Sequence, residues 1–138
     1  MAARLLARAP RTEAELEARL VALGYHAATA AAAVARCREL GWVGDVAYAR
    51  DRARSLRARG AGSLRIVAEL TSRGIPETLA ETAAEESRDG EREVVWARRA
   101  LGRRGDLDDP RVRARAWRLL AGRGFAEEVV AELLGIPG

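Results

Sequence analysis

The chain has 138 residues and a mass of 14.9 kDa, and its 24 basic and 20 acidic side chains give a net charge of +4. Every basic residue is arginine, alanine supplies much of the apolar share, and only six residues are aromatic. This composition favours closely packed helices over β-sheet, and the basic balance favours an acidic partner, with nucleic acid first and an anionic membrane second.

The predicted location is the cytoplasm. Cys37 is the only cysteine, so no internal disulfide can form, which excludes a disulfide-stapled secreted domain. Arg4 and Arg8 interrupt the N-terminal apolar stretch too early for a signal peptide, and they predict a short amphipathic first helix instead. No apolar run reaches transmembrane length, so no membrane association is expected.

The first segment after that helix predicts two more helices. Thr12 and Glu15 fit a capping box that opens a helix over 12–23. Apolar side chains at three- and four-residue spacing then predict a helix over about 26–40, which Gly41 ends.

The middle segment predicts three helices. Asp45 is a candidate N-cap for a helix over 45–59, a second helix runs over 63–73, and Pro76 suits the first turn of a third that reaches about 88. One apolar stripe on the first of them is formed by Val46, Ala49, Ala53 and Leu56.

The last segment predicts another three. Helices are expected over 91–103, over 110–122 and over 125–134. Asp109 followed by Pro110 gives the second of these an N-cap and a first-turn proline. Nine predicted helices in three groups of three account for nearly the whole chain.

A glycine-containing motif occurs three times in the sequence. Gly24, Gly74 and Gly124 lie 50 residues apart, each preceded at position −4 by leucine and followed by a bulky apolar residue. A glycine just past a helix can adopt the left-handed conformation that closes a C-cap, while the next apolar residue packs on the last turn. These glycines are the predicted bends between successive helices.

A repeat of this length predicts an all-α fold of three tandem three-helix repeats, helix-turn-helix-like units that form an elongated, curved array. The units are expected at 1–43, with a shortened leading helix, at 44–89 and at 90–138.

Charge is segregated along the chain. Residues 50–73 contain seven arginines and two acids, and residues 98–123 contain nine arginines and three acids. Residues 77–93 contain seven acids and two arginines. Helical spacing places two rows of arginines on helix flanks. We expect these rows, with Arg65 and Tyr48, to be the partner-binding candidates; the rows are Arg50, Arg54 and Arg57, and Arg111, Arg115 and Arg118. Tyr48 either packs on a neighbouring unit or meets a partner.

Catalytic and metal chemistry are not expected. His26, the sole histidine, falls at a helix start, and Cys37 lies on an apolar helix face, so no nucleophile–base pair is evident. Asp106, Asp108 and Asp109 form the one tight carboxylate cluster, which a helix cap explains better than a metal site. We predict no enzyme activity and no cofactor.

The middle segment, ELGWVGDVAYARDRARSLRARGAGSLRIVAELTSRGI, resembles the RecX family, modulators of the recombinase RecA. The matching positions are Leu40, Gly41, Asp45, Tyr48, Ala49, Arg57, Gly60, Gly62, Arg65, Ile66, Glu69, Leu70, Arg73, Gly74 and Ile75. The flanking segments also fit the family, so the resemblance covers essentially the whole chain.

The resemblance implies a regulator, most simply an inhibitor, that binds the RecA–single-stranded DNA filament. It would restrain filament extension, strand exchange and DNA-dependent ATP hydrolysis, and so act in homologous recombination, DNA repair and the SOS response. Partners would be RecA, single-stranded DNA and duplex DNA through phosphate contacts, and the protein would be a monomer. The alternatives are a stand-alone DNA-binding regulator and a structural adaptor whose arginines only solubilise it. A third is an enzyme built on the aspartate cluster.

Overall fold

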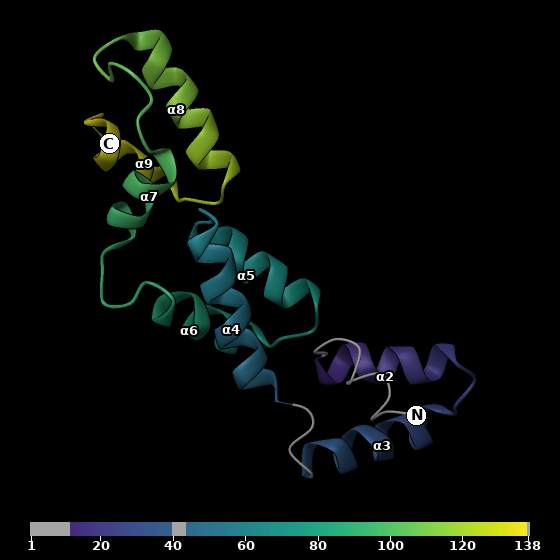
Figure 1. Ribbon diagram of the computed structural model, residues 1–138. Helices are drawn as coiled ribbons and strands as arrows, with labels where there is room; N and C mark the ends of the chain where they lie inside the picture. The colour runs from purple at the N-terminus through teal and green to yellow at the C-terminus, as the bar shows by residue number, and fades with distance from the viewer. Residues whose placement is uncertain (1–11, 40–43, 138) are drawn as a thin grey trace.

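The computed structural model describes residues 12–39 and 44–137, and everything described in these ranges is helix, turn or loop. Eight helices follow one another, and their labels are those of Figure 1. Their bounds are α2 Glu13–Ala22, α3 Ala27–Glu39, α4 Asp45–Ala58, α5 Ser63–Ser72, α6 Glu77–Glu86, α7 Glu93–Leu101, α8 Pro110–Gly122 and α9 Glu127–Leu134. The predicted amphipathic first helix lies outside the described residues.

The helices form three groups that succeed one another along an elongated molecule (Figure 1). Helices α2 and α3 lie at one end, α4, α5 and α6 in the middle, and α7, α8 and α9 at the other end. The fold is therefore an all-α array of helical repeats, as the 50-residue spacing predicts. We call the groups the first, second and third unit.

Each unit has its own hydrophobic core. Leu16, Leu20, Val34 and Cys37 are among the buried residues that join α2 to α3. The second unit is held by Ala49, Ala53, Leu56, Ala61, Ile66, Leu70, Ile75, Ala80, Ala83 and Ala84. The third is held by Ala97, Leu101, Ala116, Leu120, Phe125, Val130 and Leu134. We keep the unit boundaries at 43/44 and 89/90 as a proposal.

The three predicted bends share one geometry. Gly24, Gly74 and Gly124 have φ of 102°, 90° and 91°, the left-handed backbone that the spacing predicts. In each bend the glycine N–H donates to the carbonyl three residues back, at 3.0–3.1 Å, and the next N–H donates to the carbonyl five residues back, at 3.1–3.2 Å. These are the two hydrogen bonds of a Schellman motif, which satisfy two of the carbonyls at the end of each helix.

The predicted caps are partly right. Thr12 and Glu15 form both bonds of the capping box, and Asp109 accepts a hydrogen bond from the backbone N–H of Arg111. The assignment of Asp45 as an N-cap is wrong, because Gly44 occupies that position and Asp45 is the first helical residue. Val46 is also not in the core. It is 50% exposed, because the core of the second unit takes side chains of α4 only from the following turn onward.

Candidate partner-binding interface

The units meet through junctions that repeat with the sequence. In the first junction, Thr12 at the start of α2 donates its hydroxyl to the Arg73 carbonyl in the second bend, at 2.7 Å. Fifty residues later, the N–H of Gly62 at the start of α5 donates to the Arg123 carbonyl in the third bend, at 2.8 Å. The N-terminus of one unit's second helix thus faces the bend of the next unit, which places the positive end of a helix dipole against outward-facing carbonyls.

Glycine allows the backbones of neighbouring units to approach closely at these junctions. A Cβ atom on Gly74 would collide with the Ala14 side chain, and one on Gly62 would lie 2.5 Å from the Gly124 carbonyl carbon. One on Gly124 would lie 2.5 Å from the backbone nitrogen of Arg65. The bend glycines therefore serve both the left-handed turn and the approach of one unit's backbone to the next.

An acidic side chain completes each junction. The N–H of Glu13 donates to Asp45 Oδ1 at 3.1 Å, and the N–H of Ser63 donates to Glu93 Oε1 at 2.9 Å. In both cases the carboxylate belongs to the first residue of the next unit's leading helix and caps the second helix of the preceding unit. Sequence reasoning missed this role; the available signal was an acid at the start of both α4 and α7.

Arg57 is a structural residue of the second junction, and the prediction that it contacts a partner is wrong. Its side chain is 1% exposed and pairs with Glu93 at 2.6 Å. The remaining N–H groups donate to Ser87 Oγ at 3.1 Å, Ser63 Oγ at 2.7 Å and two backbone carbonyls at 3.0 and 3.4 Å. All five guanidinium donors are used inside the protein, so none is left for a ligand.

Tyr48 is also engaged by its own unit. Its half-buried ring packs against the core of the second unit, and its hydroxyl accepts a hydrogen bond from Arg73. The Arg73 guanidinium lies 5.9 Å from the ring centroid. The side chain therefore packs within its own unit.

The other row members on the second unit differ from one another. Arg50 is exposed but donates to Glu86 at 3.0 Å, with 56% of the arginine side chain accessible. Arg54 and Arg65 are exposed, and no carboxylate of the described residues lies within 4.0 Å of either. The predicted row on α4 is thus reduced to Arg54 and a paired Arg50.

The row on α8 is intact. Arg111, Arg115 and Arg118 are all exposed. Within the described parts of the chain, none of their guanidiniums has a carboxylate within 4.0 Å, although nine other arginines are paired there. Three cations at i, i+4 and i+7 on an outer helix form a linear array of donors that suits phosphates or a carboxylate-rich surface. We call these three residues the α8 row.

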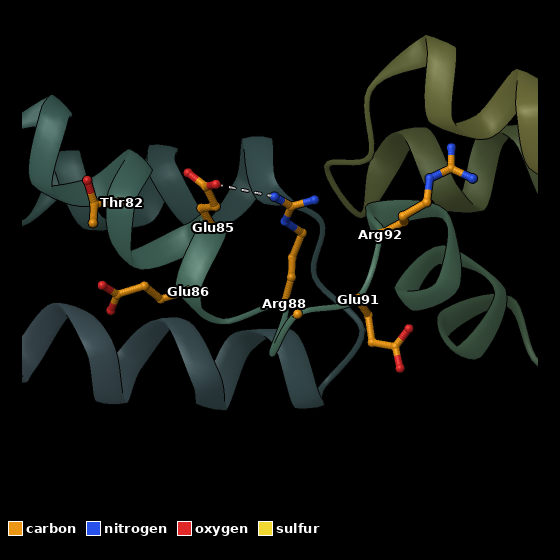
Figure 2. A pocket seen from close by; sticks show the side chains of 7 residues that line it. Thr82, Glu85, Glu86, Arg88, Glu91 and Arg92 are labelled. Atoms are coloured by element: carbon orange, nitrogen blue, oxygen red, sulfur yellow. Dashed lines mark ion pairs between the residues drawn. The ribbon is translucent and has the colours of Figure 1, made fainter.

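The acidic segment forms a different surface. A hollow of about 530 Å³ is lined by the end of α6 and the segment that leads into α7. Figure 2 shows its charged side chains, which are Glu85, Glu86, Arg88, Glu91 and Arg92. Arg88 pairs with Glu85 at 3.7 Å, and Arg92 pairs with Glu132 of α9 at 2.6 Å. Its charges are matched internally, so this hollow does not suit an anionic ligand.

The residues considered for catalysis have ordinary surroundings. Cys37 is buried in the first unit's core, and His26 is exposed just before α3. In the aspartate cluster, Asp109 caps α8 and Asp106 accepts the N–H of Asp108 at 2.9 Å. One titration shift stands out: a hydrogen bond to Glu13, reinforced by its charge, raises the pKa of Arg38. No helix in the described residues has the length and apolar character needed to cross a bilayer.

These features define a class: a helical-repeat protein whose units are joined through glycine bends, with a row of exposed arginines on α8. Two family models match the chain, the first three-helix domain of RecX at residues 1–37 and the second at 45–83. The regulatory protein RecX of Chromohalobacter salexigens is 39% identical over 132 residues, covering 94% of this chain and 85% of the relative. A regulatory protein RecX of Thermus thermophilus is 39% identical over 131 residues, covering 95% and 85%.

The chain belongs to the RecX family of regulatory proteins. A crystal structure of RecX from Lactobacillus salivarius has the same fold, with a TM-score of 0.85 over 97% of this chain and 90% of that one. The sequence identity in that pair is 19%, so this likeness bears on the fold alone.

Proposed function

We propose that this protein regulates RecA by binding the RecA–single-stranded DNA filament through exposed arginines, and that it restrains filament extension, strand exchange and coupled ATP hydrolysis. Membership of the RecX family supports RecA as the partner. The array is elongated because its units contact mainly their neighbours. An elongated protein can lie along a helical filament and touch several protomers.

The single observation that carries the mechanism is the α8 row. Its three guanidiniums are exposed and lack a carboxylate within the ion-pair distance in the described residues, so binding a partner breaks no internal pair. Arg54 and Arg65 extend the basic surface onto the second unit, and Arg50 can contribute only by giving up Glu86. The partner groups would be DNA phosphates or carboxylates that line a groove of the filament.

Further parts of the proposal follow from the family assignment. The protein would work as a cytoplasmic monomer in homologous recombination, DNA repair and the SOS response, and it would contact single-stranded DNA within the filament. Duplex DNA would be bound weakly, through its phosphates. Sequence-specific readout is not proposed, since the chain contains neither asparagine nor glutamine, the side chains that commonly read adenine. No chemical step is assigned to any residue.

The test is the DNA-dependent ATPase of RecA, titrated with wild-type protein and with the triple variant Arg111→Glu, Arg115→Glu, Arg118→Glu. A matched control, Arg19→Glu, Arg36→Glu, Arg98→Glu, changes the net charge equally at exposed positions on other helices. The proposal predicts inhibition by the wild type and by the control, and roughly a tenfold or greater loss of potency in the α8-row variant.

Two outcomes would contradict it. Equal inhibition by all three proteins rejects the arginine mechanism, because the row would then contribute nothing specific. An unaffected ATPase with wild-type protein counts against an inhibitory role altogether. Circular dichroism checks that both variants keep their helices, which is expected because the substituted side chains are exposed.

A further inference from the structure

A second basic feature lies where the second and third units meet. A hollow of about 220 Å³ is lined by the C-terminal end of α4, by one side of α7 and by the C-terminal end of α8. Its polar lining is contributed by arginine: Arg59 from α4, Arg99 from α7, Arg123 from the end of α8, and the buried Arg57. None of the described residues that line it is acidic.

The charge in this hollow is not balanced. Glu93 neutralises Arg57. The nearest carboxylate to Arg99 is Glu91, at 3.9 Å, while neither Arg59 nor Arg123 has one within 4.0 Å among the described residues. Three guanidiniums with one distant counter-ion therefore converge on a small concave space, which raises the local concentration of anions.

The backbone is shaped to bring these groups together. Gly60 has φ of 97°, and a Cβ atom there would collide with the Arg123 guanidinium, which reaches across the junction from the third unit. Arg99 is held from below by Trp96, with its guanidinium carbon 4.8 Å from the ring centroid. Arg99 is thus positioned by a contact with the face of its guanidinium, which does not use the N–H groups.

Two of the three arginines also have a simpler role. Arg59 and Arg123 are the C-cap residues of α4 and α8, where a positive side chain complements the helix dipole. That role acts on each helix separately. It does not require both side chains to enter one hollow.

We propose that this hollow, Arg59, Arg99 and Arg123 beside Gly60, binds a phosphate group of a single-stranded nucleic-acid backbone. The planar, forked guanidinium matches the oxygens of a phosphate, and several together suit an anion better than any neutral ligand. Because the three cations come from both units, an occupied site would also tighten the second junction. The inference rests on the proposed function, since it names where DNA meets the array, but it can be tested without RecA.

The experiment measures binding of a fluorescently labelled oligothymidylate by anisotropy at several salt concentrations. The test variant is Arg59→Gln/Arg123→Gln, and the control is Arg19→Gln/Arg36→Gln, which removes the same charge from the first unit. The test variant is expected to bind oligothymidylate roughly tenfold more weakly, because it loses one charge-assisted contact. The negative slope of log K against log salt should become shallower by about 0.7, the value for one phosphate of a single strand. The control is expected to keep the wild-type slope.

A second variant separates geometry from charge. Gly60→Ala leaves every charge in place, but it puts a methyl group where the Arg123 guanidinium lies and strains the turn, whose φ is 97°. It should weaken oligothymidylate binding as well, whereas Arg59→Lys/Arg123→Lys should restore part of it. Inorganic phosphate, followed through the indole N–H resonance of Trp96, is the probe for the other source of the same chemistry.

Equal binding by the test variant and the control would overturn the proposal. So would a phosphate-dependent shift at Trp96 that the test variant abolishes while oligothymidylate binding is unchanged, because the site would then take free phosphate. Inhibition of RecA by the α8 row does not depend on this site. Failure here with intact inhibition therefore rejects the phosphate hollow and leaves the proposed function standing.

Discussion

Replacement of Arg57 by methionine tests most sharply the division of the arginines into structural and exposed ones. Arg57→Met keeps much of the side-chain volume but removes five hydrogen bonds and the buried partner of Glu93. Breaking a buried ion pair on one side costs about 3–5 kcal/mol, since the other charge is left uncompensated. Glu93 is still 15% exposed and still accepts the N–H and hydroxyl of Ser63, at 2.9 and 2.6 Å.

We therefore expect the low end of that range, about 3 kcal/mol, and a fall in Tm of roughly 10 °C. The comparison is Arg50→Met, which removes an exposed pair from the same predicted row and should cost no more than about 1 kcal/mol. Urea unfolding followed by circular dichroism measures both. In an array, the loss of a junction also uncouples neighbours, so Arg57→Met should broaden or split the transition.

A double-mutant cycle with Glu93→Gln isolates the pair. The amide retains an oxygen for the Ser63 N–H, so the cycle reports mainly the charge interaction, for which we expect a coupling of about 1–3 kcal/mol. The reasoning would be refuted by a cost for Arg57→Met that equals that of Arg50→Met, or by a coupling near zero. Either result would mean that Arg57 is not locked into the junction and is free to meet a partner.

Three further predictions concern the junctions and caps. Gly124→Ala should destabilise the protein by about 2 kcal/mol or more, and Gly135→Ala by about 1 kcal/mol. Both glycines have positive φ, but only at Gly124 would the new Cβ lie 2.5 Å from the Arg65 backbone nitrogen. Parallel urea titrations compare the two variants, and equal costs would contradict the close approach. Thr12→Val should cost about 1–3 kcal/mol in thermal unfolding, since it removes both the helix cap and the 2.7 Å hydrogen bond to the second bend. The control is Thr71→Val, because the Thr71 hydroxyl bonds only within its own helix. A smaller cost for Thr12→Val than for Thr71→Val would contradict this prediction. Asp109→Ala should cost about 1 kcal/mol in urea unfolding, and addition of Mg²⁺ should not change this difference if the carboxylate is a cap.

The bends and caps could be predicted because they are local. A glycine after a helix, with a leucine four residues before it and an apolar residue after it, encodes a Schellman motif within six residues. The capping box of Thr12 and Glu15 is local in the same way. The 50-residue repeat then extended one local observation to the architecture of the array.

The fate of individual arginines could not be predicted in this way. Helical spacing places Arg50, Arg54 and Arg57 on one flank of α4, but of these three only Arg57 is buried, where it bonds to the Ala84 carbonyl of α6 and to Glu93 at the start of α7. Which residue of the row is buried depends on contacts with residues 27 to 36 positions away in the sequence. The carboxylates of Asp45 and Glu93 show the same limit, since the helices that they cap belong to the preceding unit.

The central claim is that exposed arginines hold this protein on a filament that contains single-stranded DNA, and the salt dependence of that binding tests it most directly. With Arg57 internal and Arg50 paired, five candidates remain: Arg54, Arg65 and the three of the α8 row. If each neutralises one phosphate, affinity for the RecA–single-stranded DNA filament should fall roughly 10²-fold between 50 and 200 mM salt, with a smaller fall for the α8-row variant. Affinity that is the same at both salt concentrations, or an equal fall in wild type and variant, would contradict the account.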